Sequence, residues 1–194
     1  MTFEILPIGD GHTALGDDDA EGLIPSYIST RDELFEAEQR NIAEALLRTV
    51  PTIDRLLDDR YLRNLHGSMF DQVWRWAGTY RVREANIGID PRDISPAVRN
   101  LVEDARTWFD YGENPDDIAV RFHHRLVSIH AFPNGNGRHG RISADYLAQA
   151  AGSTSLTWGF NLGLDTEDLR TQYLRALRIA DRGDLNELLI FARS

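Results

Sequence analysis

The sequence predicts an all-α protein, a helical bundle that carries one short β-hairpin flap. Apolar residues recur every three and four positions through most of the chain after residue 30, which is the period of a helix with one buried face. Residues typical of a hairpin, with Val82, Ile87 and Ile89 set among turn formers, occur in one stretch only. A chain of 194 residues is also long enough to bury a full core as one compact domain.

The elements follow in chain order. Residues 1–30 are rich in Gly, Pro and Asp and predict an irregular arm. A helix over residues 31–50 follows, because Ser29 or Thr30 can cap it and Pro51 ends it. Residues 51–194 then form the main domain. Its expected helices cover residues 60–76, 96–110, 116–129, 137–151, 165–181 and 184–192, and the flap covers residues 84–92.

Charge and composition exclude several classes of function. The chain has 21 Lys and Arg against 31 Asp and Glu, a net charge of −10, so we expect no direct binding to nucleic acid, which requires a basic face. The absence of cysteine excludes disulfides, iron–sulfur clusters, thiolate zinc sites and a cysteine nucleophile. Residues 1–7 hold no basic segment, and no apolar run approaches the roughly 20 residues of a membrane span. We therefore expect a cytoplasmic protein that does not bind membranes.

The chemistry is concentrated between two predicted helices, in the segment HAFPNGNGRHGR at residues 130–141. Pro133 and the Asn-Gly-Asn-Gly run require a tight loop, and a new helix begins near Gly137. The free N–H groups of that helix, together with loop amides, form a cradle for an anion. Arg138 and Arg141 lie on one face of the helix, and His130 precedes the cradle as a candidate base. This combination favours phosphoryl or nucleotidyl transfer.

The segment has two other interpretations. Gly135, Gly137 and Gly140 match the glycine fingerprint of dinucleotide-binding domains, but that fingerprint follows a strand, whereas residues 118–129 have a helical period. The segment could also be a plain structural loop with solvated arginines. The nearby His130 and the second arginine argue against the plain loop.

The segment resembles the signature of the Fic family, H-x-F-x-(D/E)-(A/G)-N-G-R-x-x-R. The matching residues are His130, Phe132, Gly135, Asn136, Gly137, Arg138 and Arg141. Residues 76–81 (WAGTYR) and 86–89 (NIGI) resemble the segment that leads into the Fic flap and the flap itself, so the resemblance covers about residues 55–150. Residues 20–25 (AEGLIP) and the short N-terminal helix further resemble a Fic subfamily called mobile mystery protein B.

The resemblance implies a protein adenylyltransferase that moves AMP from ATP to a Ser, Thr or Tyr hydroxyl of a target protein. It makes His130 the base and Phe132 the anchor of the loop. It places Gly135, Asn136 and Gly137 around the phosphates, with Arg138 and Arg141 on the outer phosphates. The flap residues Asn86, Ile87, Gly88 and Ile89 would dock the target by strand addition.

One position departs from the signature. Asn134 stands where the family has the acidic ligand of Mg²⁺, and an amide oxygen is a weaker ligand than a carboxylate. Three alternatives to AMP transfer from ATP therefore stay open: another nucleotide, phosphorylation of the target, or a nucleotide-binding protein without catalytic activity. The last alternative fits the subfamily resemblance, which implies a toxin–antitoxin-like pair with an antitoxin-like or helix-turn-helix partner protein.

The resemblance also suggests self-inhibition. Many Fic proteins carry a helix with (S/T)-x-x-x-E-(G/N), whose glutamate pairs with the second arginine of the signature. Glu38 is the first candidate here and Glu33 the second, although both matches are partial. We expect one of them to pair with Arg141.

Overall fold

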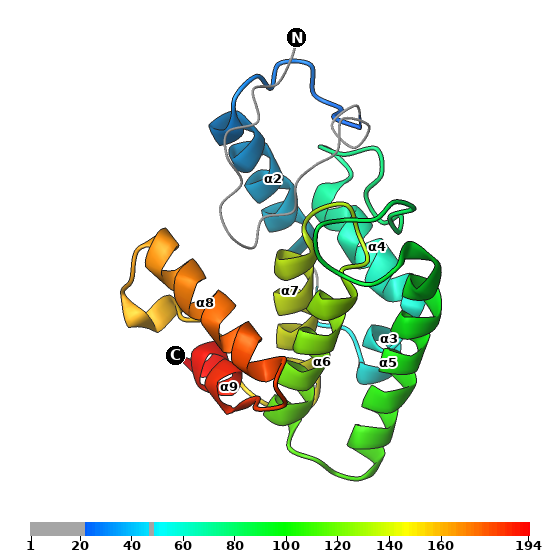
Figure 1. The fold of residues 1–194 in the computed structure, drawn as a ribbon, viewed down its shortest axis with the longest axis vertical. Coiled ribbons are helices and arrows are strands. Elements are labelled where there is room, and N and C mark those ends of the chain that lie inside the picture. Colours follow the sequence, from blue (N-terminus) through cyan, green and yellow to red (C-terminus); the bar gives the residue numbers. More distant parts are fainter. Residues whose placement is uncertain (1–21, 47–48) are drawn as a thin grey trace.

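The computed structural model describes residues 22–46 and 49–194. Residues 1–21 of the predicted arm, part of the subfamily resemblance at residues 20–25, and residues 47–48 near the end of the predicted first helix lie outside the described residues. Figure 1 shows how the elements of the described residues are arranged. They are α2 (Arg31–Leu46), α3 (Ile53–Leu56), α4 (Asp59–Phe70), η1 (Pro91–Asp93), α5 (Ile94–Asp110), α6 (Pro115–Ile129), α7 (Asn136–Ala150), η2 (Phe160–Leu162), α8 (Thr166–Ala180) and α9 (Asn186–Arg193).

The bundle is built around the pair α6 and α7, which lie side by side and are joined by the loop of residues 130–135 (Figure 1). Helices α3, α4 and α5 pack on one side of this pair, and α8 packs on α9, which contacts α6 on the other side. Helix α2 packs on α4. The all-α prediction is confirmed, since within the described ranges the only β-type pairing is an isolated antiparallel bridge between Leu23 and Trp74.

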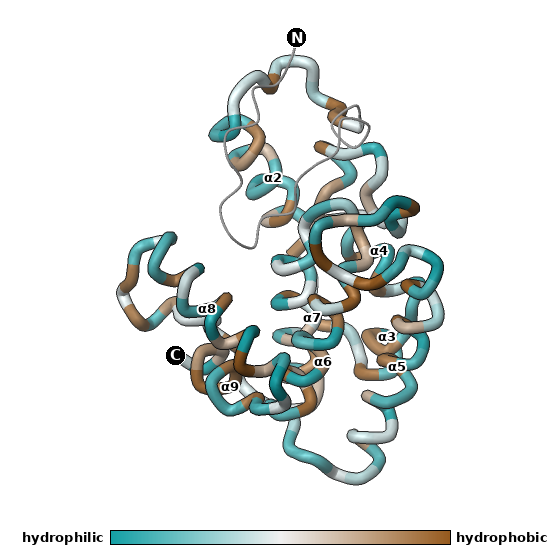
Figure 2. Tube along the Cα trace, in the orientation of Figure 1, coloured by the Kyte–Doolittle hydropathy of each residue, from teal (hydrophilic) through white to brown (hydrophobic). Residues whose placement is uncertain are grey.

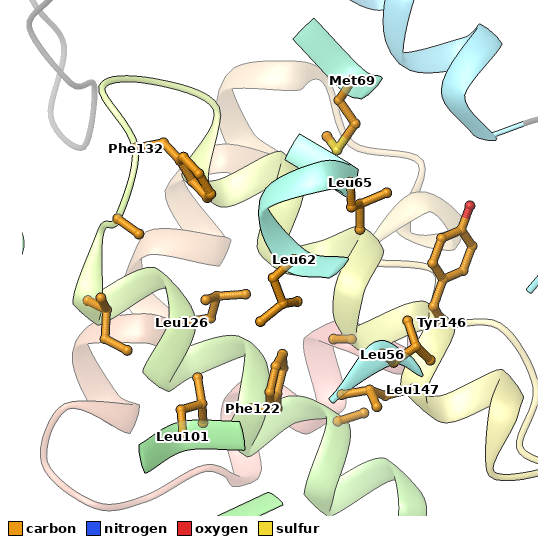
Figure 3. Packing of buried hydrophobic residues seen from close by; sticks show 14 of the residues in the cluster. Leu56, Leu62, Leu65, Met69, Leu101, Phe122, Leu126, Phe132, Tyr146 and Leu147 are labelled. Atoms are coloured by element: carbon orange, nitrogen blue, oxygen red, sulfur yellow. The ribbon is translucent and has the colours of Figure 1, made fainter. Parts of the chain in front are cut away.

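The core forms where the apolar faces of these helices meet. Leu62 of α4, Leu101 of α5 and Phe122 of α6 are fully buried and converge in Figure 3. Figure 2 shows α3 and the inner stretches of α5 and α6 as hydrophobic, whereas the connection between α5 and α6 is hydrophilic. Burying a large apolar side chain contributes roughly 1.5–3 kcal/mol, so this convergence fixes how α6 and α7 sit and where their joining loop emerges.

Helix α4 ends earlier than the sequence predicts. The expected helix over residues 60–76 stops at Phe70, although its apolar spacing continues to Val73 and Trp76. The backbone beyond Phe70 pairs elsewhere: Ile24 N–H donates to Val73 O at 2.9 Å and Arg75 N–H donates to Gly22 O at 2.9 Å. These bonds engage the Val73 carbonyl and the Arg75 N–H outside the helix, although Trp74 N–H still donates to Phe70 O at 2.8 Å.

The predicted β-hairpin is not present, because residues 80–90 contain no paired strands. The backbone of this segment is held instead by one buried side chain. The Arg81 guanidinium donates to the carbonyl oxygens of Arg83 and Ile89. Bonds from a central guanidinium curve the segment into a loop, whereas a hairpin needs a ladder between two extended strands. We keep the name flap for residues 84–92.

Helix α2 begins with a reciprocal cap. The Glu33 carboxylate accepts from the N–H of Ser29 at 2.7 Å and of Thr30 at 3.0 Å, and Glu33 N–H donates to Thr30 Oγ1 at 3.2 Å. This capping box satisfies the free donors of the first turn. Glu33, the second inhibitory candidate, is therefore engaged at the exposed start of the helix.

Within the described residues, no helix is both long and apolar enough to cross a membrane.

Candidate active site

The loop between α6 and α7 is shaped by two residues with left-handed backbone. Helix α6 ends at His130, with φ 53° and ψ 58°, and α7 is preceded by Gly135, with φ 80°. A Cβ on Gly135 would lie 2.5 Å from Cε2 of Phe70, so the position tolerates only glycine without rearrangement. The two turns place His130 and the open N-terminus of α7 at the same end of the bundle.

Asn136 holds the loop closed. Its Oδ1 accepts from the Phe132 N–H at 2.9 Å, and its Nδ2 donates to the Phe132 carbonyl at 2.7 Å. The Asn136 side chain, which the family resemblance places around the phosphates, is therefore occupied by hydrogen bonds within the loop. The Asn136 N–H in the first turn of α7 has no intrahelical acceptor and is the group that can meet an anion.

Phe132 lies in an aromatic cluster beneath the loop, as expected for an anchor. The side chain is 1% exposed and stacks on His66, with ring centroids 3.7 Å apart and an interplanar angle of 14°. His66 itself bridges two segments: its Nδ1 accepts from Gly78 N–H at 3.0 Å, and its Nε2 donates to the Asn134 carbonyl at 3.0 Å. This pair of bonds requires the neutral ring, and burial keeps the pKa of His66 well below its ordinary value.

His130, the predicted base, is 4% exposed at the C-terminal end of α6. Burial, followed by the nearby Arg81 charge, lowers the pKa of His130 to about 4, against the smaller opposing effect of a hydrogen bond with the Val127 backbone. The imidazole is therefore neutral at pH 7, with one ring nitrogen as donor and the other as acceptor. A neutral imidazole can take a proton from a hydroxyl.

Arg81 joins the flap to this histidine. Its Nε donates to the His130 carbonyl at 2.7 Å, and its backbone N–H donates to the Ala131 carbonyl at 2.9 Å. The flap lies directly on the site, since a Cβ on Gly88 would fall 2.5 Å from the Cβ of His130. The flap residues and the candidate base, predicted as neighbours, are thus brought together.

Arg138 pairs with Glu38. The Arg138 NH1 and Glu38 Oε2 atoms lie 2.7 Å apart, and the Arg138 guanidinium also lies over the Phe70 ring at 4.8 Å. Glu38 is 5% exposed, and its second oxygen accepts from Trp74 Nε1 at 2.7 Å. The prediction that Glu38 pairs with Arg141 is wrong, because the packing of α2 against α4 directs Glu38 to the first turn of α7.

Arg141 lies one helical turn further along α7, over the ring of Tyr173 from α8, with 5.1 Å from Cζ to the ring centroid. Gly137 lies beneath both groups: a Cβ there would be 3.7 Å from Arg141 NH1 and 3.8 Å from the Tyr173 hydroxyl oxygen. Both signature arginines therefore lie near the N-terminal end of α7. Arg138 contacts Glu38 of α2, and Arg141 contacts Tyr173 of α8.

Asn134 does not form a metal site with its neighbours. Its Oδ1 accepts from the Gly135 N–H at 2.7 Å, and the loop segment of residues 130–141 supplies no carboxylate. No group of three or more acidic or histidine side chains in the described ranges has the geometry of a metal site. The residues present do not fit a Mg²⁺ ion held by the protein itself.

The sequence analysis did not assign roles to three residues of the site: His66, Arg81 and Tyr173. A signal existed for His66, which follows Leu62 by four positions and so lies on the buried face of α4. Arg81 was noticed only as part of the Fic-like WAGTYR segment. Tyr173 lies far along the chain, and no local pattern connects it to the loop.

Comparison with known proteins agrees with this geometry. The model of the Fic/DOC family matches residues 56–148. A Fido domain-containing protein of Dictyostelium discoideum is 35% identical over 110 residues, which cover 54% of this chain and 72% of that protein. A protein named protein adenylyltransferase Fic, from Drosophila willistoni, is 25% identical over 101 residues, and the match spans only 19% of its length.

Solved structures share the fold. BepC, a VirB-translocated effector protein of Bartonella tribocorum with bound AMPPNP, has a TM-score of 0.68 at 19% identity, with 92% of this chain and 97% of that chain covered. A Fic domain of Bartonella quintana with bound ADP has a TM-score of 0.66 at 18% identity, with 87% and 86% covered. The signature loop between two packed helices, the match to the family model and the similarity to the Dictyostelium protein agree that this chain belongs to the Fic/DOC family.

Proposed function

We propose that the protein is an adenylyltransferase that transfers AMP from ATP to a hydroxyl side chain of a target protein. The observation that carries the proposal is the neutral His130 beside the open N-terminus of α7, with two arginines on that same helix. Fic-type nucleotide transfer in general is supported by family membership. The finer assignment to AMP rests on the names of the Drosophila relatives and on the AMPPNP and ADP bound by structural neighbours.

The residues of this chain fit the steps of such a transfer. The acceptor nitrogen of His130 takes the proton of the target hydroxyl as its oxygen attacks the α-phosphorus of ATP. A new oxygen–phosphorus bond forms, the bond to the bridging oxygen breaks, and pyrophosphate leaves. The first N–H groups of α7, with Arg138 and Arg141, stabilise the charge on the phosphates, which is the main requirement of phosphoryl-type transfer. The flap, which packs on His130, positions the target segment.

The Glu38–Arg138 ion pair makes the resting protein self-inhibited under this proposal. Arg138 is one of the two arginines that bind the phosphates under this proposal. The buried Glu38 carboxylate already forms an ion pair with it. A phosphate that binds there must displace the carboxylate, and the two negative charges repel each other. Trp74 keeps Glu38 in place through its indole N–H.

Mass spectrometry of intact protein and of a bacterial lysate tests the proposal. Wild type, Glu38→Gly and His130→Ala are incubated with ATP and Mg²⁺, and we expect an AMP-sized increment that rises in Glu38→Gly and is lost in His130→Ala. Glu36→Gly is the matched control, because Glu36 lies on the same helix but is exposed and pairs only with Arg40 among the described ion pairs. It should label like wild type.

Other outcomes separate the alternatives. A phosphate-sized increment would mean that the protein phosphorylates its target. ATP binding without any increment would favour another nucleotide or a protein without catalytic activity, for which Asn134 in the metal-ligand position is the supporting feature. Equal labelling by Glu38→Gly and Glu36→Gly would contradict self-inhibition by Glu38.

A further inference from the structure

A buried chain of polar groups extends from Arg141 into the bundle. Tyr173 of α8 is almost fully buried and is hydrogen-bonded to Arg141. On its far side, the Tyr173 hydroxyl lies 3.0 Å from Nε2 of His123, a fully buried residue of α6. Three helices, α6, α7 and α8, thus contribute one residue each to a continuous hydrogen-bonded line that ends at the candidate phosphate site.

The direction of these hydrogen bonds follows from the chemistry of the groups. A guanidinium has donors only, so Arg141 donates to the Tyr173 oxygen. The Tyr173 hydroxyl can then donate its proton to His123 Nε2 in the neutral tautomer that carries its proton on Nδ1, a tautomer that fits the hydrogen bond of this ring with the Gly140 backbone. The state of the ring agrees, because burial, and next the Arg141 charge, lower the pKa of His123 to about 3. Each group in the line therefore has one defined role and one defined orientation.

We propose that Tyr173 is a positioning residue that holds the Arg141 guanidinium over the first turn of α7, where it meets the outer phosphates of the bound nucleotide. The Tyr173 oxygen and the ring face act on Arg141 together, one as hydrogen-bond acceptor and the other as a cation–π surface. Both groups lie next to Gly137, where a Cβ would be in ordinary van der Waals contact with each of them. The inference rests on the proposed binding of a nucleotide at this site.

Tyr173 lies outside the part of the chain that the family model matches. The family model ends at residue 148, whereas α8 begins at Thr166, so the support for a signature arginine comes from outside the matched segment. A free arginine side chain samples many rotamers, and a pre-oriented one binds its anion with less loss of conformational entropy. Helix α8 thereby tunes the affinity for polyphosphate without touching the ligand.

Isothermal titration calorimetry of the full chain with ATP and with AMP tests the inference. Tyr173→Phe keeps the ring and removes the hydroxyl. We expect ATP affinity to fall about tenfold, the loss of one hydrogen bond to a charged group, while AMP affinity changes less than about twofold. Tyr111→Phe, the same change at an exposed tyrosine at the end of α5, should bind both nucleotides like wild type.

A double-mutant cycle separates positioning from a general structural role. If Tyr173 acts through Arg141, Tyr173→Phe has no further effect on ATP affinity in the Arg141→Ala background. His123→Leu removes the acceptor for the Tyr173 hydroxyl and should give a smaller, equally ATP-selective loss, which keeps the inference testable if Tyr173→Phe does not fold.

Four results would overturn the inference. Equal losses for ATP and AMP would indicate a general effect on the fold. Additive effects of Tyr173→Phe and Arg141→Ala would show that the two residues act separately. If Arg141→Ala weakens ATP binding relative to wild type but Tyr173→Phe does not, Tyr173 does not position Arg141, although the protein still binds the nucleotide. A wild-type protein that binds no ATP would overturn the proposed function as well.

Discussion

Gly135 allows the loop of residues 130–135 to turn directly into α7. Its backbone has φ 80°, and a Cβ would lie 2.5 Å from the Phe70 ring, which in turn lies under Arg138. The absence of a side chain at Gly135 thus permits both the backbone turn and the position of the Phe70 ring beneath Arg138. Asn136 and His66 hold the same loop by hydrogen bonds to its backbone. At the residue scale, the signature maintains the shape of the site as much as it contacts the ligand.

We predict that Gly135→Ala destabilises the protein by about 2–4 kcal/mol, the sum of left-handed strain and overpacking against Phe70. Gly112→Ala is the matched control, because Gly112 also has a positive φ, 69°, but its Cβ would meet nothing within 4 Å. That variant should lose only the strain, about 1–2 kcal/mol. Urea unfolding of both variants measures the difference, and equal losses would contradict the clash with Phe70.

The flap and the end of α6 behave as one element because Arg81 holds both. Its guanidinium donates to three backbone carbonyls, of His130, Arg83 and Ile89, and its own N–H donates to Ala131. Exposed apolar residues project from the surface of this segment, with Val82 86% exposed. An element with few buried contacts depends on such a single polar anchor for its conformation.

We predict that Arg81→Ala releases the flap. Three carbonyls lose their donor, so the backbone amides of residues 84–90 should exchange hydrogen markedly faster, by about tenfold or more if roughly 1.4 kcal/mol of local stability is lost. Hydrogen-exchange mass spectrometry measures this change. Arg92→Ala, at an exposed arginine that pairs with Asp90 at the C-terminal end of the flap, should leave the exchange nearly unchanged. Unchanged exchange in Arg81→Ala would rule out its role as the anchor.

Across residues 22–46 and 49–194, four buried histidines have lowered pKa values: His66, His123, His130 and His139. Burial is the largest cause in each case, and the pKa of His139 falls to about 4. The lowered pKa values favour neutral rings in the folded protein, whereas the unfolded chain protonates these rings below about pH 6.5. Stability is therefore fully present above that pH and falls as the pH decreases toward 4.

We predict that the free energy of unfolding decreases steeply between pH 7 and pH 5. Each histidine contributes up to about 1.4 kcal/mol per pH unit once its unfolded form is protonated. Thermal unfolding across this range measures the slope. His139→Gln, whose amide can still donate to the Leu62 carbonyl, should make the slope shallower because the unfolded chain then takes up one proton fewer. A melting temperature that is constant from pH 7 to pH 5 would contradict the prediction.

Much of the fold could be predicted because it is encoded locally. The helices predicted over residues 96–110, 116–129 and 137–151 match α5, α6 and α7 within two residues at each end. Errors arose where tertiary bonds competed with local ones. The helix predicted to reach Trp76 ends at Phe70 because residues 73–75 pair with residues 22–24, and the hairpin is replaced by bonds to the Arg81 side chain. The spacing of residues along the sequence gives no information about hydrogen-bond partners that are distant in the chain.

The sequence by itself determined the helices, the turn at residues 130–135 and the placement of Arg138 and Arg141 on α7, since backbone preferences and helical spacing act over a few residues. Only the tertiary structure decided which groups these arginines meet. Glu38 lies 100 residues before Arg138, and Tyr173 reaches Arg141 from a separate helix. Such pairs depend on how apolar faces pack whole helices together, and a shift of one helix would exchange the partners without altering any local pattern.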